Sequence, residues 1–231
     1  MKKLLIVLVS LAATSALAQD CPKYMNVLAV NGLNMRSKPE SNARIVTNVA
    51  FGKQVEILER TEMQLKLGWI NDHWYRVRYR GREGFIYGGY LSELRAPEKQ
   101  PAKKLSDLLP LYGTLAFETE GSVIESKEGL GSDTVNIQIV KFTNGAELEL
   151  ELGKDGSKAV LILPASVQEA YVLVEALLKT HGMASLLDSL RFIHGRDGIL
   201  TRVNNANGSI LIRPIDNGMT SITFTHQMAM E

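Results

Sequence analysis

The sequence contains a single cysteine, Cys21, and only two tryptophans among its 231 residues. One cysteine cannot form a disulfide within the chain, so Cys21 is either a free thiol or part of an intermolecular crosslink. An excess of either charge is also lacking, because 26 lysines and arginines nearly balance 25 aspartates and glutamates. A chain with so little net charge has no overall field that would attract nucleic acid or an anionic membrane.

Long apolar runs are missing after the N-terminus. The one clear run, from Leu4 to Ala13, follows Lys2 and Lys3 and precedes a stretch of small residues that ends at Ala18. It is well short of the roughly 20 residues that span a bilayer. This order of basic, apolar and small residues is typical of a secretory signal. The sequence therefore predicts a signal peptide at residues 1–18, cleaved after Ala18, and a periplasmic or secreted protein.

Cys21 lies close to that cleavage site, where a lipoprotein would carry its lipid. Asp20 precedes it, whereas lipid-modified cysteines normally follow a small residue, so the sequence argues against a lipoprotein. Loss of residues 1–18 removes two lysines and lowers the formal charge from +1 to about −1. The mature chain therefore remains almost neutral.

Common catalytic and metal-binding motifs are absent from the sequence. It has no G-x-S-x-G, no H-E-x-x-H, no phosphate-binding glycine loop and no cysteine pair. His181, Asp188, His194 and Asp197 lie in one stretch and offer groups for metal binding or proton transfer, but such residues commonly cap helices and turns. We predict no catalytic residue, no metal site and no cofactor, and the sequence favours a binding protein over an enzyme.

A segment with little apolar surface separates two parts of the chain. Residues 95–107 contain two prolines and several basic residues, and Leu105 is their one large apolar residue. Such a segment is typical of a linker. We predict a first domain at residues 25–94 and a second at 108–231, which fold independently.

Short stretches of alternating apolar and polar residues, bounded by glycine and proline, predict several strands in the first part. They lie at residues 33–36, 52–60 and 74–87. Several short strands within about 70 residues predict a small β-barrel. The apolar positions that would point into its core are Leu33, Met35, Val55, Ile57 and Val77.

Five pieces of this part follow one another in a recognisable order. They are Leu33–Pro39, Gly52 with Val55 and Ile57, Trp74 with Val77, Gly84–Ile86, and Tyr90-Leu91. This order resembles the bacterial SH3 (SH3b) family over about residues 25–94. The resemblance implies an SH3-like barrel that recognises cell-wall peptide or glycan, or a protein.

Two features depart from that family. Phe85 stands where the family usually has tryptophan, and residues 61–73 form a longer excursion that carries Trp69 in a predicted loop. An exposed aromatic residue on a loop is a candidate for binding, although Trp69 could instead fold back onto the barrel as a lid. Aromatic contact area and directional charge together predict a binding surface. Its candidate residues are Trp69, Tyr75, Arg78, Tyr87 and Tyr90.

The arginines in this part form a second candidate surface. Arg76, Arg78 and Arg80 alternate along a predicted strand, so they project to one face and add their charges, and Arg82 follows. This pattern indicates either an anionic partner or a solvated face that discourages edge pairing. Export argues against nucleic acid as the partner.

The second part predicts an α+β domain that begins with an antiparallel meander near residues 134–163. Asn144-Gly145 has the sequence of a two-residue type I′ turn, which would place Ile139 opposite Leu150. The alternating Glu147, Glu149 and Glu151 would form the solvent face of the sheet, and their spacing is not that of a calcium-binding loop. Further strands are predicted near residues 199–203, 209–215 and 220–226.

A long helix follows the meander. Ser166 and Glu169 form a capping box at its start, and Gly182 is a natural end. Apolar residues cover most of its circumference, so we expect it to be buried against the apolar face of the meander. A short helix is predicted around residues 184–192. The whole chain is therefore mainly β and α+β: a small SH3-like barrel, then an α+β domain of no recognised family.

Three functions remain open at this level. Export and the family resemblance favour a non-catalytic envelope protein that binds peptidoglycan or an envelope protein partner. The second is a cell-wall hydrolase whose catalytic half is residues 108–231 and whose barrel is a targeting arm. The third is a scaffold subunit of an envelope complex. None of them involves nucleic acid or a transmembrane segment after signal cleavage, and the sequence leaves the oligomeric state open.

Overall fold

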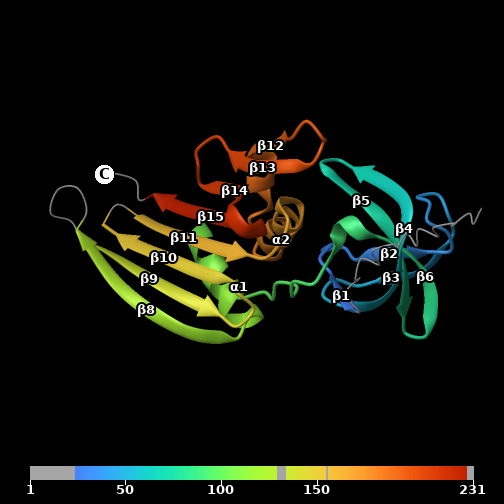
Figure 1. The fold of residues 1–231 in the computed structure, drawn as a ribbon, viewed down its shortest axis with the longest axis horizontal. Coiled ribbons are helices and arrows are strands. Elements are labelled where there is room, and N and C mark those ends of the chain that lie inside the picture. The colour runs from blue at the N-terminus through green and yellow to red at the C-terminus, as the bar shows by residue number, and fades with distance from the viewer. Residues whose placement is uncertain (1–23, 129–133, 155, 228–231) are drawn as a thin grey trace, which may run out of the picture.

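The computed structural model describes residues 24–128, 134–154 and 156–227. The predicted signal peptide, its cleavage site and Cys21 lie outside these ranges. The described chain is mostly β and contains two antiparallel sheets, with helices in the C-terminal part (Figure 1). The predicted fold class is confirmed. Among the described helices, none combines the length and the apolar character needed to cross a bilayer.

The first sheet has seven strands in the order β3-β2-β6-β5-β4-β1-β7 and curls around its own core. Its strands are β1 Tyr24–Val27, β2 Leu33–Arg36, β3 Ile45–Val49, β4 Gln54–Leu67, β5 Ile70–Tyr79, β6 Arg82–Tyr87 and β7 Leu91–Ser92. A short 3-10 helix, η1 Gly88–Tyr90, lies between the last two strands.

The core of this sheet confirms the predicted strand parity. Met35, Val55, Ile57 and Val77 are buried in one cluster, and Leu33 packs against it while remaining partly exposed. Alternate residues of a strand point to opposite faces, so the opposite face of β5 and β6 is free to pack elsewhere.

The excursion at residues 61–73 is not a loop but the end of a long hairpin. Strands β4 and β5 continue pairing up to Leu67 and Ile70, and Gly68-Trp69 forms the turn. Gly68 has a φ of 58° and Trp69 does not have a positive φ, which fits a type II′ turn. Apolar and polar residues alternate from Glu62 to Leu67, a strand pattern that the predicted loop overlooks.

The second sheet has eight strands in the order β12-β13-β14-β15-β11-β10-β9-β8. Its strands are β8 Thr119–Glu128, β9 Thr134–Phe142, β10 Glu147–Gly153, β11 Gly156–Leu163, β12 Leu190–His194, β13 Leu200–Asn205, β14 Ile210–Pro214 and β15 Thr220–Gln227. Its helices are η2 Leu105–Asp107, α1 Leu108–Ala116, α2 Val167–Thr180, η3 Ala184–Ser189 and η4 Asp216–Gly218.

The three C-terminal strands lie close to their predicted positions. The sequence pattern gave no sign of α1 or β8. The short helix predicted around residues 184–192 is correct only in its first part, because the chain forms η3 and then continues as β12.

The predicted two-residue turn between β9 and β10 is wrong. Phe142 N donates to Ala146 O at 3.0 Å, so the loop has three residues, and Leu150 lies opposite Gln138. A type I′ turn needs a positive φ at both central residues. Here Gly145 has a φ of 80°, but the φ of Asn144 is not positive. Asn144 instead accepts a hydrogen bond from Ala146 N through its side-chain oxygen, at 3.1 Å. This is the three-residue hairpin that ends in a left-handed glycine.

Helix α2 has the predicted ends but a different position. Ser166 Oγ accepts a hydrogen bond from Glu169 N at 3.1 Å, and Gly182 follows the helix with a φ of 74°. The Glu169 carboxylate bonds to the Ser92 hydroxyl of the first sheet. The helix packs on β13, β14 and β15, whereas α1 occupies the expected place against β10 and β11. The prediction that α2 packs against the meander is therefore wrong.

One apolar core joins the two parts of the chain. The outer face of the first sheet contributes Ile70, Trp74 and Tyr87 to the cluster that also contains Leu108 and Leu177 of the helices. In Figure 1, α2 lies between the second sheet and the curled first sheet. The same strand, β5, therefore supplies Val77 to one core and Trp74 to the other.

Residues 95–107 run along the second part and bond to it. Tyr112 Oη donates to Arg95 O at 2.9 Å, and Gln100 N donates to His181 Nε2 at 3.3 Å. Leu105, at the end of the segment, is 8% exposed. The segment is thus held in place, and the independent folding of the two domains stays a prediction.

Candidate binding groove

Trp69 lies at the tip of the β4–β5 hairpin and contacts the second part of the chain. Its ring stacks on Phe192 of β12 with centroids 4.8 Å apart and an interplanar angle of 12°, and His194 lies 5.9 Å away. Phe192 and His194 are two residues apart on one strand and project to the same side. The side chain keeps 51% of its surface exposed. Trp69 is therefore neither a lid on the barrel nor an unattached loop residue.

A groove of about 510 Å³ opens beside this ring. It lies between the hairpin tip, the start of α2 and the turns that precede β13 and β15. Trp69, Ile199 and Met219 give it apolar surface, and Ile199 is 63% exposed. Both parts of the chain line the groove, and in Figure 1 the tip of the hairpin meets the end of β12 and β13.

The polar side chains of the groove are partly bonded to the protein. Gln168 Oε1 accepts a hydrogen bond from Asn71 N at 2.9 Å, which ties β5 to α2 and leaves the amide NH₂ of Gln168. Asp197 Oδ1 accepts from Ile199 N at 3.0 Å, so its second oxygen remains for another donor. These groups are held in position and still have hydrogen-bonding capacity.

A second cleft, of about 690 Å³, lies between the two parts and has an acidic lining. Asp72, Glu93, Glu118 and Glu169 line it together with Arg95. Burial raises the pKa of Asp72 and of Glu169, although the hydrogen bond from Ser92 acts in the opposite direction on Glu169. Within the ranges that the structure describes, no three histidine, cysteine or acidic side chains are placed to hold a metal ion.

The predicted site residues do not form one surface. Trp69 lines the groove, whereas Tyr87 is 4% exposed and donates its hydroxyl to Ile70 O at 2.9 Å. Tyr90 lies beside Tyr87 at the joint between the two parts, where burial and the nearby Glu175 raise the pKa of Tyr90 to about 12. Tyr75 packs against the core of the first sheet. Tyr87 is therefore part of the core rather than a contact surface.

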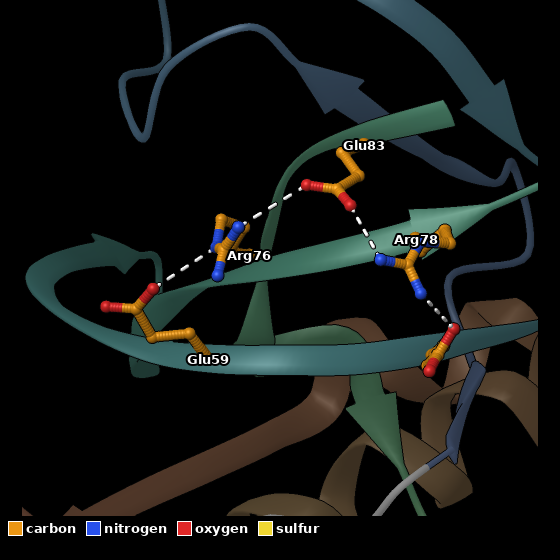
Figure 2. A network of polar contacts seen from close by, with 5 residues as sticks. Glu59, Arg76, Arg78 and Glu83 are labelled. Carbon is orange, nitrogen blue, oxygen red and sulfur yellow. Dashed lines mark hydrogen bonds and ion pairs between the residues drawn. The ribbon is translucent and has the colours of Figure 1, made fainter. Parts of the chain in front are cut away.

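Arg78 belongs to an exposed network of ion pairs (Figure 2). Its guanidinium lies 3.1 Å from Glu56 and 2.7 Å from Glu83, and Arg76 lies 3.3 Å from Glu83. Arg76 also contacts Glu59 at 3.2 Å. The hydrogen bond between Arg78 and Glu83 raises the pKa of the arginine and lowers that of the glutamate. Carboxylates therefore neutralise this strand face, which matches the solvated alternative better than a cationic binding site.

Among the histidines and aspartates of residues 181–197, His181, His194 and Asp197 have separate contacts, and Asp188 is exposed. His181 Nδ1 lies 2.8 Å from Leu177 O, and its other ring nitrogen accepts from Gln100 N. Asp197 holds the turn before Ile199, as described above. His194 lies beside Trp69. These three residues lie at a helix end, at a turn that lines the groove and at an aromatic contact.

The curled seven-stranded sheet, with its buried alternation and closing Tyr-Leu, defines a small SH3-like domain. Residues 31–92 match the family model described as bacterial SH3 domain, so this part of the chain is a bacterial SH3 domain and the resemblance is confirmed. No curated protein matches the chain. The match starts after β1 and ends in β7, so it includes Trp69 but none of the groove residues of the second part.

Sequence reasoning found one residue of the groove and missed the others. Ile199, Met219 and Gln168 lie 99 or more positions from Trp69 and belong to a region of no recognised family. One local feature of the sequence points to the groove. Ile199 follows Asp197-Gly198 in a turn, and a large apolar residue exposed in a turn suggests a binding surface.

Proposed function

We propose that the chain is an exported, non-catalytic binding protein of the bacterial cell envelope. Its ligand is cell-wall peptide or glycan, or an envelope protein. Two observations support this proposal: residues 31–92 form a bacterial SH3 domain, and the N-terminal residues have the pattern of a secretory signal. Bacterial SH3 domains are associated with binding to the wall or to proteins, and fold analogy alone does not identify the ligand.

The observation that carries the proposal is the half-exposed Trp69 at the edge of a groove. Its ring is held by Phe192, so little side-chain entropy remains to be lost when a ligand binds. Tryptophan is also the residue type that most often anchors an interface. A rigid aromatic side chain beside a groove that two domains build together is suited to recognition.

Co-sedimentation with purified peptidoglycan sacculi tests the proposal, using the chain from residue 19 onward. We expect the protein to pellet with sacculi and Trp69→Ala to weaken this binding about tenfold, which is ~1.4 kcal/mol for an interface anchor. The matched control is Tyr24→Ala, which removes an aromatic side chain of similar exposure, 48%, outside the groove. If no binding to sacculi occurs and no protein is captured from envelope extract, the proposal is wrong.

The second candidate function is a scaffold subunit, and one surface feature favours it. Strand β8 forms the edge of the second sheet and exposes Val123 and Ile124 by 57% and 72%. An open sheet edge with exposed apolar residues can pair with another protein. Capture of one protein in a stoichiometric complex, lost in Ile124→Lys but retained in Trp69→Ala, would favour this function over wall binding.

A further inference from the structure

The groove beside Trp69 has the mixed character of a site for an amphipathic ring. Trp69 and Ile199 offer apolar surface, while Asn71, Gln168 and Asp197 offer amide and carboxylate groups. A sugar ring has an apolar face of C–H groups and a rim of hydroxyls that both donate and accept hydrogen bonds. Its face fits an aromatic ring, and its rim fits side chains such as the Gln168 amide and the second oxygen of Asp197.

The charge of the lining favours a neutral ligand. Lys66 and Asp197 are the charged side chains that line the groove, and their charges are of opposite sign. The acidic cleft nearby differs, because four carboxylates there face one arginine. A strongly anionic or cationic ligand would therefore find no complementary field in the groove.

The backbone around the groove does not favour an extended peptide. Most of the lining comes from turns and from the start of α2, and β13 is already paired with strands on both sides. At the start of β5, Asn71 N donates its hydrogen bond to Gln168 and cannot receive a peptide strand. Strand addition requires a row of free backbone groups, so this surface is better suited to side-chain recognition of a compact ring.

We propose that the groove between the SH3 domain and the second part binds a neutral saccharide, with one sugar face against Trp69 and its hydroxyls toward Gln168 and Asp197. This inference rests on the proposed wall-binding function and assigns it to the glycan rather than to the peptide. It also makes the site a joint product of both parts of the chain, since Trp69 comes from one and Ile199 from the other.

Tryptophan fluorescence provides the test. The chain has two tryptophans, and Trp74 is 4% exposed. A change in the emission of solvent-exposed tryptophan therefore reports on Trp69. Titration of the chain from residue 19 onward with the tetramer of N-acetylglucosamine should give a saturable blue shift. We expect a dissociation constant of about 1 mM or lower. The second probe is a soluble stem tetrapeptide, which should cause no shift.

Two exposed isoleucines of neighbouring strand ends give a matched pair of variants. Ile199 lines the groove, whereas Ile193 is 48% exposed on β12 and does not. We expect Ile199→Asp to weaken oligosaccharide binding at least tenfold and Ile193→Asp to leave it unchanged, with both melting temperatures close to that of the parent chain. Equal effects of the two variants would overturn the proposed site.

The outcomes separate this inference from the proposed function. Binding to sacculi with a shift caused by the tetrapeptide and none caused by the oligosaccharide would retain wall binding and refute the saccharide. Binding to sacculi with no response to either probe also refutes it. Oligosaccharide binding without binding to sacculi would retain the saccharide site and refute the wall as its source.

Discussion

Replacement of Val77 by Asp should unfold the SH3 domain. Val77 is fully buried in the first core, against Met35, Val55 and Ile86. The aspartate loses the apolar contacts of valine and places a carboxyl within a cluster of buried apolar side chains. An unpaired buried carboxyl costs several kcal/mol, even when it takes up a proton, and a small domain has about 5–15 kcal/mol of stability.

Val77→Ala provides the graded comparison. Loss of two methyl groups costs about 1.6 kcal/mol in transfer free energy, and the cavity raises this to about 2–3 kcal/mol. For a domain of this size, each kcal/mol lowers the melting temperature by about 4–8 °C. Exposed Val123 on β8 is the control, because Val123→Asp makes the same chemical change in a solvated position that is 57% exposed.

Circular dichroism and tryptophan fluorescence during thermal and urea unfolding would measure these effects. The sign of the pH dependence is a second check on Val77→Asp. Burial raises the pKa of the new carboxyl in the folded state, so the penalty is smallest below the unfolded pKa of ~3.9 and grows as the pH rises above it. Near-parental melting of Val77→Asp at pH 7 would mean that the face of β5 assigned to the core is wrong.

Three further predictions concern the fold. Trypsin should cut first at the exposed Lys99 or Lys103, and the two fragments should co-elute on gel filtration because one apolar core joins them; separate elution would refute a shared core. Tyr87→Phe should lower stability by about 1 kcal/mol in urea unfolding, through loss of the hydrogen bond to Ile70 O, and an unchanged midpoint would contradict this. Gly145→Val should cost more than 1 kcal/mol because of the φ of 80°, whereas Gly121→Val at an open position of ordinary φ should cost less.

The parts of the fold that follow from local pattern could be predicted from the sequence. The alternation around Leu33, Met35 and Val77 identified the first core, because the period of a strand determines which residues share a face. Ser166 and Gly182 identified the ends of α2, because a helix cap depends only on residues within a turn of the helix end.

Features that depend on contacts between distant residues could not be predicted from the sequence. The sequence Asn144-Gly145 fits both a two-residue and a three-residue loop, and the two loops differ by one residue in the pairing of β9 with β10. Only the packing of both faces of the sheet decides between these registers. Tyr87 was predicted as a contact residue because aromatic side chains offer contact area. It is buried in the apolar cluster that contains residues from both parts of the chain, including residues far from it in the sequence.

The length of the β4–β5 hairpin explains why the candidate site lies where it does. A shorter connection would end near Thr61 and Trp74, within the first sheet. The added residues carry Trp69 beyond the sheet to Phe192, and the Asn71–Gln168 bond holds the extension against α2. Because an aromatic stack and a hydrogen bond hold the tip against the second part, the groove keeps its shape only while the two parts stay together. If the groove binds a ligand that spans Trp69 and Ile199, as we propose, binding should also stabilise the docking of the two parts.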